Sequence, residues 1–242
     1  MIAALLFFAC TPAPSTAEAD ESHEWQGWVY ADLPSDTNEG LDLGAVRLWD
    51  MDGNLVSEGE QPDEDRPGVW RFLIDEAVDA EIRISGPDQI TTVWRTAAPD
   101  AQAYWYAGAL FAAKQATMDN FWADLADMLG QPMGTADKAH LLGQPLLLWG
   151  EDEAAWTDAT ITVYDGDGTV HPAIALSEDE SGLLLPSEMT DGPIVTFAAP
   201  DLTPGPIRLV VDSSDGRNVV MDYNAGPGEL LSAFAFTLPE PQ

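Results

Sequence analysis

Short stretches in which apolar and polar residues alternate recur along the whole chain, separated by clusters of Gly, Pro and Asp. Because successive side chains of a strand point to opposite faces, this alternation predicts half-buried β-strands. Short strands separated in this way are typical of β-sandwiches. The predicted strands cover residues 25–31, 45–50, 69–74, 80–85, 90–95, 103–106, 108–113, 144–150, 160–165, 182–185, 194–198, 207–212, 219–223 and 230–238.

One segment near the middle of the chain has the period of a helix instead. Thr117 is placed to cap its N-terminus, Asp119 falls in its first turn, and Gly130 and Pro132 end it. Its apolar residues recur three and four positions apart: Met118, Phe121, Trp122, Leu125, Met128 and Leu129. We expect this stripe to pack on one of the protein's own sandwiches and to fix the angle between them. The alternative is a groove in another protein.

Three landmarks occur twice in the same order, which predicts a duplicated module. The first is an alternating strand that runs into Asp-x-Asp-Gly, the second a strand that ends in Pro-Asp, and the third a small, apolar closing strand. They lie at residues 46–54 and 161–169, at 80–88 and 193–201, and at 107–113 and 232–238. We therefore expect module one at residues 24–116, a helical connector at 117–139 and module two at 140–242.

The opening Gly27-x-Val29 strand, followed by a strand that leads into Asp-x-Asp-Gly, resembles the carboxypeptidase-regulatory-like, transthyretin-like and collagen-adhesin-B-like sandwiches of bacterial surface proteins. The resemblance implies a stalk, spacer or binding module rather than an enzyme. The expected fold class is mainly β: two tandem Ig-like or transthyretin-like β-sandwiches with one connecting amphipathic α-helix.

The N-terminal apolar run at residues 2–9 is too short to span a hydrocarbon core of about 30 Å, so it predicts a signal segment at residues 1–9. Cys10 follows this run directly, where the segment resembles the lipobox of bacterial lipoproteins. We expect Cys10 to be acylated and residues 10–23 to form a disordered tether. By resemblance to bacterial lipoprotein sorting, Thr11 after the cysteine favours the outer membrane. The alternative is an apolar N-terminus with an incidental cysteine.

The charge of the chain excludes several classes of partner. Its 42 acidic and 9 basic residues give a formal net charge of −33, which repels nucleic acids and anionic lipid headgroups. Membrane attachment is therefore expected through the lipid alone. Cys10 is the single cysteine, so each module is expected to depend on its apolar core without an internal disulfide. The acidic composition resembles that of salt-adapted proteins, and a merely acidic surface is the alternative.

The sequence contains no recognisable catalytic motif. His23, His140 and His171 lie far apart without the spacing of metal ligands, and no nucleophile motif or phosphate loop occurs. We expect a non-enzymatic protein without a cofactor.

Paired carboxylates in the two Asp-x-Asp-Gly turns are candidate calcium ligands: Asp50 with Asp52, and Asp165 with Asp167. Calcium takes six to eight oxygens at about 2.3–2.6 Å, so nearby acidic loops would have to complete each site. The simpler interpretation is that each motif is a hairpin turn.

Arg47, Arg71, Arg83 and Arg95 each lie between apolar neighbours in predicted strands of module one, so alternation points them away from the core. On one sheet they would form a cationic strip that could bind a carboxylate or a sulfated glycan. The alternative is pairing across strands with residues such as Glu81.

The pattern favours a lipid-anchored envelope protein that acts as a structural or protein-interaction module. A carbohydrate- or calcium-binding surface module is the alternative, since module one is rich in tryptophan and an exposed pair could stack on a sugar. A surface protein or a glycan is the expected partner, and nucleic acid is excluded.

Overall fold

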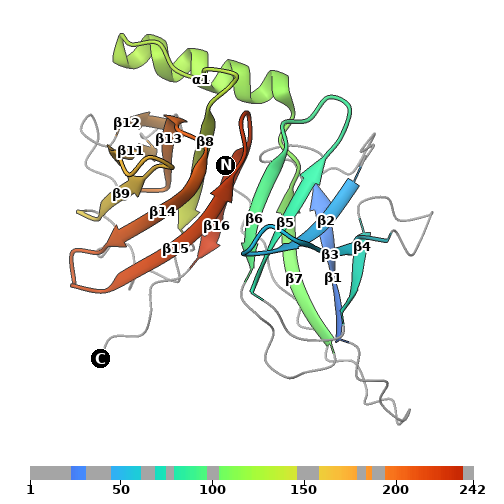
Figure 1. Ribbon diagram of the computed structural model, residues 1–242. Coiled ribbons are helices and arrows are strands. Elements are labelled where there is room, and N and C mark those ends of the chain that lie inside the picture. Colours follow the sequence, from blue (N-terminus) through green and yellow to red (C-terminus); the bar gives the residue numbers. More distant parts are fainter. Residues whose placement is uncertain are drawn as a thin grey trace.

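The computed structural model describes residues 23–30, 45–60, 69–74, 79–96, 104–145, 158–178, 184–186 and 194–236. These residues are mainly β, with one helix, as the alternation predicts. Two groups of packed strands lie side by side, and the helix lies across one end of them (Figure 1). We refer to the groups as half one, up to β7, and half two, from β8 onward.

Half one packs a three-stranded sheet on four strands of a larger sheet. The first sheet has the order β4-β1-β7, and the four strands have the order β3-β2-β5-β6. The strands are β1 (His23–Tyr30), β2 (Ala45–Asp50), β3 (Leu55–Glu58), β4 (Val69–Ile74), β5 (Ala80–Ser85), β6 (Thr92–Thr96) and β7 (Tyr104–Phe111). Leu48 and Ile82 from the larger sheet and Trp70 and Phe72 from β4 are fully buried between the sheets.

Half two repeats this arrangement with an added hairpin. Its sheets have the orders β12-β11-β13-β8-β16 and β10-β9-β14-β15. The strands are β8 (Ala139–Pro145), β9 (Thr160–Tyr164), β10 (Val170–Pro172), β11 (Ile174–Glu178), β12 (Leu184–Pro186), β13 (Thr196–Leu202), β14 (Gly205–Asp212), β15 (Asn218–Ala225) and β16 (Leu230–Phe236). Buried residues such as Leu141, Phe197 and Leu209 fill the space between the two sheets.

The same connectivity therefore occurs twice. In half one β1 pairs antiparallel with β4 and parallel with β7, and in half two β8 pairs antiparallel with β13 and parallel with β16. The hairpin β2–β3 with β5 and β6 likewise has the order of the hairpin β9–β10 with β14 and β15. By this order β5 corresponds to β14 and β13 to β4, so the match of residues 80–88 with 193–201 is wrong. The division into two tandem modules stays a prediction, because one sheet runs through both halves.

Strand β16 joins β3-β2-β5-β6 of half one and β12-β11-β13-β8 of half two into one nine-stranded sheet. Its one edge pairs with β8, and on its other edge residues Leu230 to Ser232 pair in parallel with Thr92 to Trp94 of β6. Val93 consequently lies in the buried core of half two, although it belongs to a strand of half one. The two cores are therefore continuous through the backbone of one sheet.

Helix α1 (Gln115–Leu129) packs on this sheet, on the face opposite the core of half two. Met118, Trp122 and Leu125 are buried against it, so the expectation that the stripe packs on the protein itself is confirmed for these residues, whereas Met128 at its end is exposed. The sheet residues in this cluster include Ile90, which precedes β6, together with Leu142 of β8. Because Ile90 belongs to half one and Leu142 to half two, the helix packs on both halves and ties them together. Burying each large apolar side chain contributes about 1.5–3 kcal/mol.

The ends of the helix differ in part from the prediction. Gly130 ends it in the left-handed conformation at φ 67°, as expected. The helix begins earlier, however: Lys114 is the N-cap residue, without a side-chain cap hydrogen bond, so Thr117 lies inside the first turn. Asp119 lies beyond that turn and accepts a hydrogen bond from Gln115 at 2.8 Å. The part of the chain described contains no helix long and apolar enough to cross a membrane.

Several predicted strand boundaries are corrected. The predicted strands at 103–106 and 108–113 form the single strand β7, and β8 begins at Ala139 rather than at residue 144. The short strands β3 and β10 are largely exposed on both faces, so they show no buried alternation that sequence could reveal.

Candidate functional site

Three of the four singled-out arginines lie on one face of the nine-stranded sheet, on β2, β5 and β6, whereas Arg71 lies on β4 of the three-stranded sheet. Arg47 stands opposite Arg83, and Arg95 stands opposite Glu81. This face is turned away from the core of half one, as alternation predicts, because Val46, Leu48 and Ile82 point the other way into that core. The sheet therefore brings three of these side chains together.

Each arginine has a carboxylate partner. Arg47 contacts Glu58 at 3.4 Å, Arg71 contacts Glu60 at 2.8 Å, and Arg95 contacts Asp79 at 3.5 Å. Arg95 also donates a hydrogen bond to the carbonyl of Ala80 at 2.9 Å. In the described part of the chain, the three arginines of this face therefore do not form an unpaired cationic strip, and anion binding by the four arginines stays a prediction.

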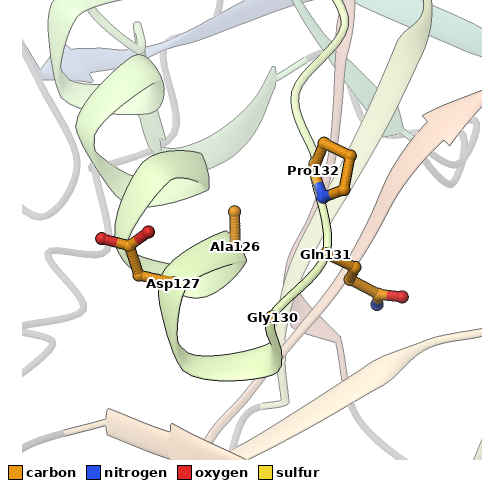
Figure 2. Close-up of a pocket in the computed structure, with 5 residues that line it drawn as sticks. All are labelled: Ala126, Asp127, Gly130, Gln131 and Pro132. Atoms are coloured by element: carbon orange, nitrogen blue, oxygen red, sulfur yellow. The ribbon is translucent and has the colours of Figure 1, made fainter.

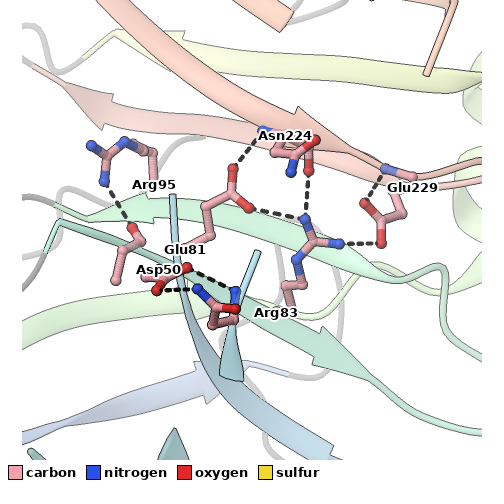
Figure 3. Close-up of polar contacts among 9 residues, drawn as sticks. Asp50, Glu81, Arg83, Arg95, Asn224 and Glu229 are labelled. Atoms are coloured by element: carbon pink, nitrogen blue, oxygen red, sulfur yellow. Dashed lines mark hydrogen bonds and ion pairs between the residues drawn. The ribbon is translucent and has the colours of Figure 1, made fainter. Parts of the chain in front are cut away.

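Arg83 is the centre of a polar network at the joint between the halves (Figure 3). Its guanidinium contacts the Glu81 carboxylate at 2.9 Å and that of Glu229 at 2.6 Å. It also donates a hydrogen bond to the carbonyl of Asn224. Glu81 is only 1 % exposed and comes from the same strand as Arg83, whereas Glu229 and Asn224 belong to half two. The network therefore connects the two halves through a mostly buried charge pair.

The same network covers part of one edge of β15. The Asn224 N–H donates to Glu81 at 2.6 Å, and the Asn224 carbonyl accepts from Arg83. On the other side of Asn224 its strand neighbour is Pro206, which has no N–H. Both outward-facing backbone groups of Asn224 are thus satisfied by side chains of β5, in the place where a neighbouring strand would normally bond them.

A shallow depression of about 270 Å³ lies beside this network. It is lined by Trp49, Gly53, Arg83, Asn224, Ala225 and Gly226. The guanidinium carbon of Arg83 lies 5.9 Å from the centre of the Trp49 ring. The Trp49 Nε1–H and the Arg83 Nε–H are buried and have no hydrogen-bond partner among the described residues. The Trp49 side chain in this lining suits a neutral ligand such as a sugar, whereas Glu81 and Glu229 beside it oppose an anion.

The second Asp-x-Asp-Gly motif forms a turn fastened by its own aspartates. Asp165 accepts hydrogen bonds from the N–H groups of Thr169 at 2.9 Å and Thr203 at 3.0 Å, and it contacts His171 Nε2 at 3.0 Å. Asp167 accepts from the Thr169 hydroxyl at 2.6 Å. Burial raises the pKa of Asp165, but the hydrogen bonds, that of Thr203 foremost, outweigh it and hold this pKa well below its usual range.

The first motif forms a more exposed turn. Asp50 accepts from the N–H of Asn54 at 2.7 Å and from its side-chain amide at 2.9 Å, which together lower the pKa of Asp50. Asp52 is exposed in the same turn. Among the described residues no group of three or more His, Cys, Asp or Glu could hold a metal ion. The hydrogen bonds account for both motifs as turns, and calcium binding stays a prediction.

The two histidines whose side chains the structure describes, His140 and His171, have structural surroundings. His140 is buried, its ring centre 5.1 Å from that of Trp122, and its Nδ1 accepts a hydrogen bond from the Asp201 N–H at 3.2 Å. Burial lowers the pKa of His140. His171 lies against Asp165 in the turn described above.

A second depression, of about 300 Å³, lies at the end of helix α1 (Figure 2). It is lined by Ala126, Asp127, Gly130, Gln131 and Pro132. Among these lining residues, Asp127 is the single one with an ionisable side chain.

Sequence reasoning missed Glu229 and Asn224 as members of the network. Arg83 and Glu229 are separated by 146 positions, and no local pattern marks either residue of half two. Cys10 lies outside the described residues, as do the side chains of Trp25, Trp28 and Trp105. Of the other tryptophans of half one, Trp70 and Trp94 are buried and Trp49 is half-buried.

No family model matches this chain, and no curated protein matches it. Among solved structures, it is similar to the Bacillus anthracis TIE protein at 11 % identity and a TM-score of 0.30, covering 90 % of this chain and 34 % of that protein. The chain thus spans about a third of the length of that structure. A Bacteroides fragilis protein described as a cell adhesion protein shares 8 % identity at a TM-score of 0.25, covering 91 % and 94 % of the chains. The major pilin subunit BcpA of Bacillus cereus shares 11 % identity at a TM-score of 0.27, covering 90 % and 69 %.

Proposed function

We propose that this chain is a non-enzymatic protein of the bacterial cell envelope, anchored through a lipid on Cys10, whose two halves form one rigid structural or interaction module. The observation that carries the proposal is the joint. Parallel pairing of β16 with β6, the network around Arg83 and the helix on the back of the sheet all connect the same two halves.

Each of these connections restricts a hinge. Strand pairing fixes register and direction, and the Arg83 network fixes the approach of β15 to the face of β5. Proteins that close on a ligand between two lobes need a flexible connection, and closure there would break these bonds. A fixed angle instead suits a spacer or a platform that holds a surface at a set distance from the membrane.

Rigidity of the joint is testable with two spin labels. Asp52 in half one and Val170 in half two are exposed turn or edge positions. We expect spin labels on Asp52→Cys and Val170→Cys, in a Cys10→Ser background, to give one narrow distribution of label-to-label distances by pulsed electron–electron double resonance. Asp52→Cys paired with a cysteine at Val56 in the same half is the control for the intrinsic width of the label. A distribution much broader than the control, or two populations, would contradict a rigid module.

The lipid anchor is tested by detergent partitioning. The protein expressed in a Gram-negative host should enter the detergent phase of Triton X-114, and Cys10→Ser should move it to the aqueous phase. Equal partitioning of the two proteins would refute the anchor and leave the rigid joint untouched.

A second function, carbohydrate binding, is favoured by the depression at Trp49. The half-buried Trp49 lines the depression, and an aromatic side chain in such a position is a group that binds sugars. A glycan panel read by calorimetry should show binding that Trp49→Ala abolishes. Tyr164→Ala is the matched control, because Tyr164 is an aromatic residue, 40 % exposed, at the corresponding strand end of half two. Binding that both substitutions weaken equally, or no binding, would reject this site.

A further inference from the structure

The two longest free strand edges of the molecule are β7 and β15. Each has eight residues, and each pairs on one side only among the strands that the structure describes. The remaining sheet edges are short or interrupted: β10 and β12 have three residues each and contain Pro172 and Pro186, and β3 has four residues. The edge of β4 is bridged at Arg71 to Glu60. Short strands and prolines are the devices by which proteins block unwanted strand pairing, and β15 has neither these nor a lysine.

These two edges are also the counterparts of the two strands that form the joint. By the repeated order of strands, β7 occupies in half one the place of β16 in half two, and β15 occupies in half two the place of β6 in half one. In the joint, β16 of half two pairs in parallel with β6 of half one. Among the described strands of one chain, none pairs with β15 in the way that β16 pairs with β6, and the corresponding partner would be β7 of another chain.

The register identifies the residue of β15 that such a contact would bury. The Asp50 and Asp165 turns are equivalent, so the residues that stand opposite one another can be compared outward from each turn. In half one, Arg47 of β2 stands opposite Arg83 of β5, which stands opposite Val93 of β6. In half two, Thr162 of β9 stands opposite Val210 of β14, which stands opposite Val220 of β15. Val220 is therefore the counterpart of Val93. Val93 is fully buried in the core of half two, whereas Val220 is 50 % exposed.

The backbone of β15 is oriented to accept a strand at this point. The N–H and carbonyl of Asn224 point outward, because they bond Glu81 and Arg83 rather than Pro206 of β14. Backbone groups of alternate residues in an antiparallel strand point to the same side, so those of Val220 also point outward. Asn224 is covered by the network of half one, and among the described residues no strand covers the edge at Val220.

We propose that a second copy of this chain docks its β7 on the edge of β15 at Val220, which repeats between two chains the joint that β16 and β6 form within one. The contact is heterologous, because it pairs β15 of one copy with β7 of the other, and it leaves β7 of the first copy and β15 of the second open for further copies. This inference deepens the proposed structural role by naming its partner, and it rests on that role. The charge of −33 opposes association, so salt that screens it should strengthen the contact.

Sedimentation velocity of the full chain carrying Cys10→Ser, which removes lipid-driven association, tests the contact. The weight-average sedimentation coefficient should rise with protein concentration, and more steeply in about 1 M than in about 0.1 M NaCl. Val220→Lys should weaken association by about tenfold or more, since it places a charge at the position that corresponds to Val93, which is buried in the internal joint. Val220→Pro should do the same, because it removes an outward N–H that β14 does not use.

Val170→Lys is the matched control, because it makes the same change at a valine that is 55 % exposed on the opposite edge strand of the same sheet. It should leave association unchanged. Mixing the two proteins tests which strands pair. The Val220→Lys variant keeps an intact β7, so it should still bind β15 of the unsubstituted chain, whereas two copies of the variant should not bind each other.

Three results would overturn the proposal. One is an unsubstituted chain that stays monomeric at every concentration and salt, the second is an equal loss of association in Val170→Lys and Val220→Lys, and the third is the absence of mixed complexes, which would indicate β15 pairing with β15. None of these results bears on the spin-label distances, so failure of this contact is distinguishable from failure of the rigid module.

Discussion

Removing Arg83 should destabilise the protein far more than removing an exposed arginine of similar geometry. Arg83→Met keeps an apolar side chain of comparable length but leaves the Glu81 carboxylate, which is 1 % exposed, without its cationic partner. Breaking a buried ion pair from one side costs about 3–5 kcal/mol, because the remaining charge stays desolvated. The Arg83 side chain is itself 21 % exposed, and the Asn224 N–H still bonds Glu81, so we expect about 3 kcal/mol.

The assay is equilibrium unfolding in urea at fixed salt, supported by thermal melts. For a chain of this size, about 3 kcal/mol corresponds to a loss of roughly 6–12 °C in Tm. Arg208→Met is the control, because Arg208 also contacts a carboxylate through two nitrogens, Asp222 at 2.6 and 3.1 Å, but both side chains are at least half exposed. Exposed pairs of this kind contribute little to stability.

A double-mutant cycle separates the buried charge from the lost packing. Arg83→Met together with Glu81→Gln removes both charges, and the glutamine oxygen can still accept from the Asn224 N–H. We expect the double variant to recover about 1–3 kcal/mol relative to Arg83→Met alone. If Arg83→Met costs no more than Arg208→Met, or if Glu81→Gln adds to the loss instead of offsetting it, the electrostatic account of the joint is wrong.

Three further predictions concern pH, packing and salt. Burial lowers the pKa of His140 in the fold, so the unfolded chain binds its proton first, and stability should fall as pH decreases from about 7.5 to 5.5. His140→Gln should flatten the pH dependence of stability from urea unfolding over that window, and an unchanged pH dependence would refute the role of His140. Gly166→Ala should cost about 1–3 kcal/mol, since its Cβ would lie 2.2 Å from the carbonyl oxygen of Pro204; an unchanged Tm in thermal melts would refute the clash. The Tm should climb between about 0.01 M and 1 M NaCl as the Debye length falls from about 30 to 3 Å, and a Tm indifferent to salt would mean that the net charge of −33 is energetically neutral.

The strands that sequence locates best are those with one buried and one exposed face. The predicted strands 45–50, 69–74 and 80–85 coincide with β2, β4 and β5. Alternation is a direct record of a sheet with one face in a core. The same property predicts that Arg47, Arg83 and Arg95 lie on the outer face, as they do. Cross-strand pairing, the alternative to a cationic strip, holds for Arg47 with Glu58 on β3, whereas Arg83 contacts Glu81 on its own strand and Arg95 contacts Asp79 just before β5.

The joint could not be predicted for a related reason. Strands β8 and β16 are buried on both faces, with Leu141 and Leu231 in the core of half two and Leu142 and Leu230 under the helix, so their sequences show no alternation to reveal register. Parallel pairing between β16 and β6 joins positions far apart in the chain, for which a single sequence carries no signal. The extra hairpin β11–β12 in half two also shifts its later strands, so repeats sought at a nearly constant spacing pair β13 with β5, although the counterpart of β13 is β4.

The joint shows how two sheet edges can be closed by different means. The edge of β6 meets a strand that runs alongside it, so backbone pairing with β16 satisfies it. The edge of β15 at Asn224 meets the face of β5, where only side chains can reach its N–H and carbonyl. An acid and an arginine are the pair that supplies both an acceptor and a donor, which gives Glu81 and Arg83 a physical reason to be charged. At Val220 the same edge lies beyond the reach of that pair, and a strand of a second copy is the partner that we propose for it.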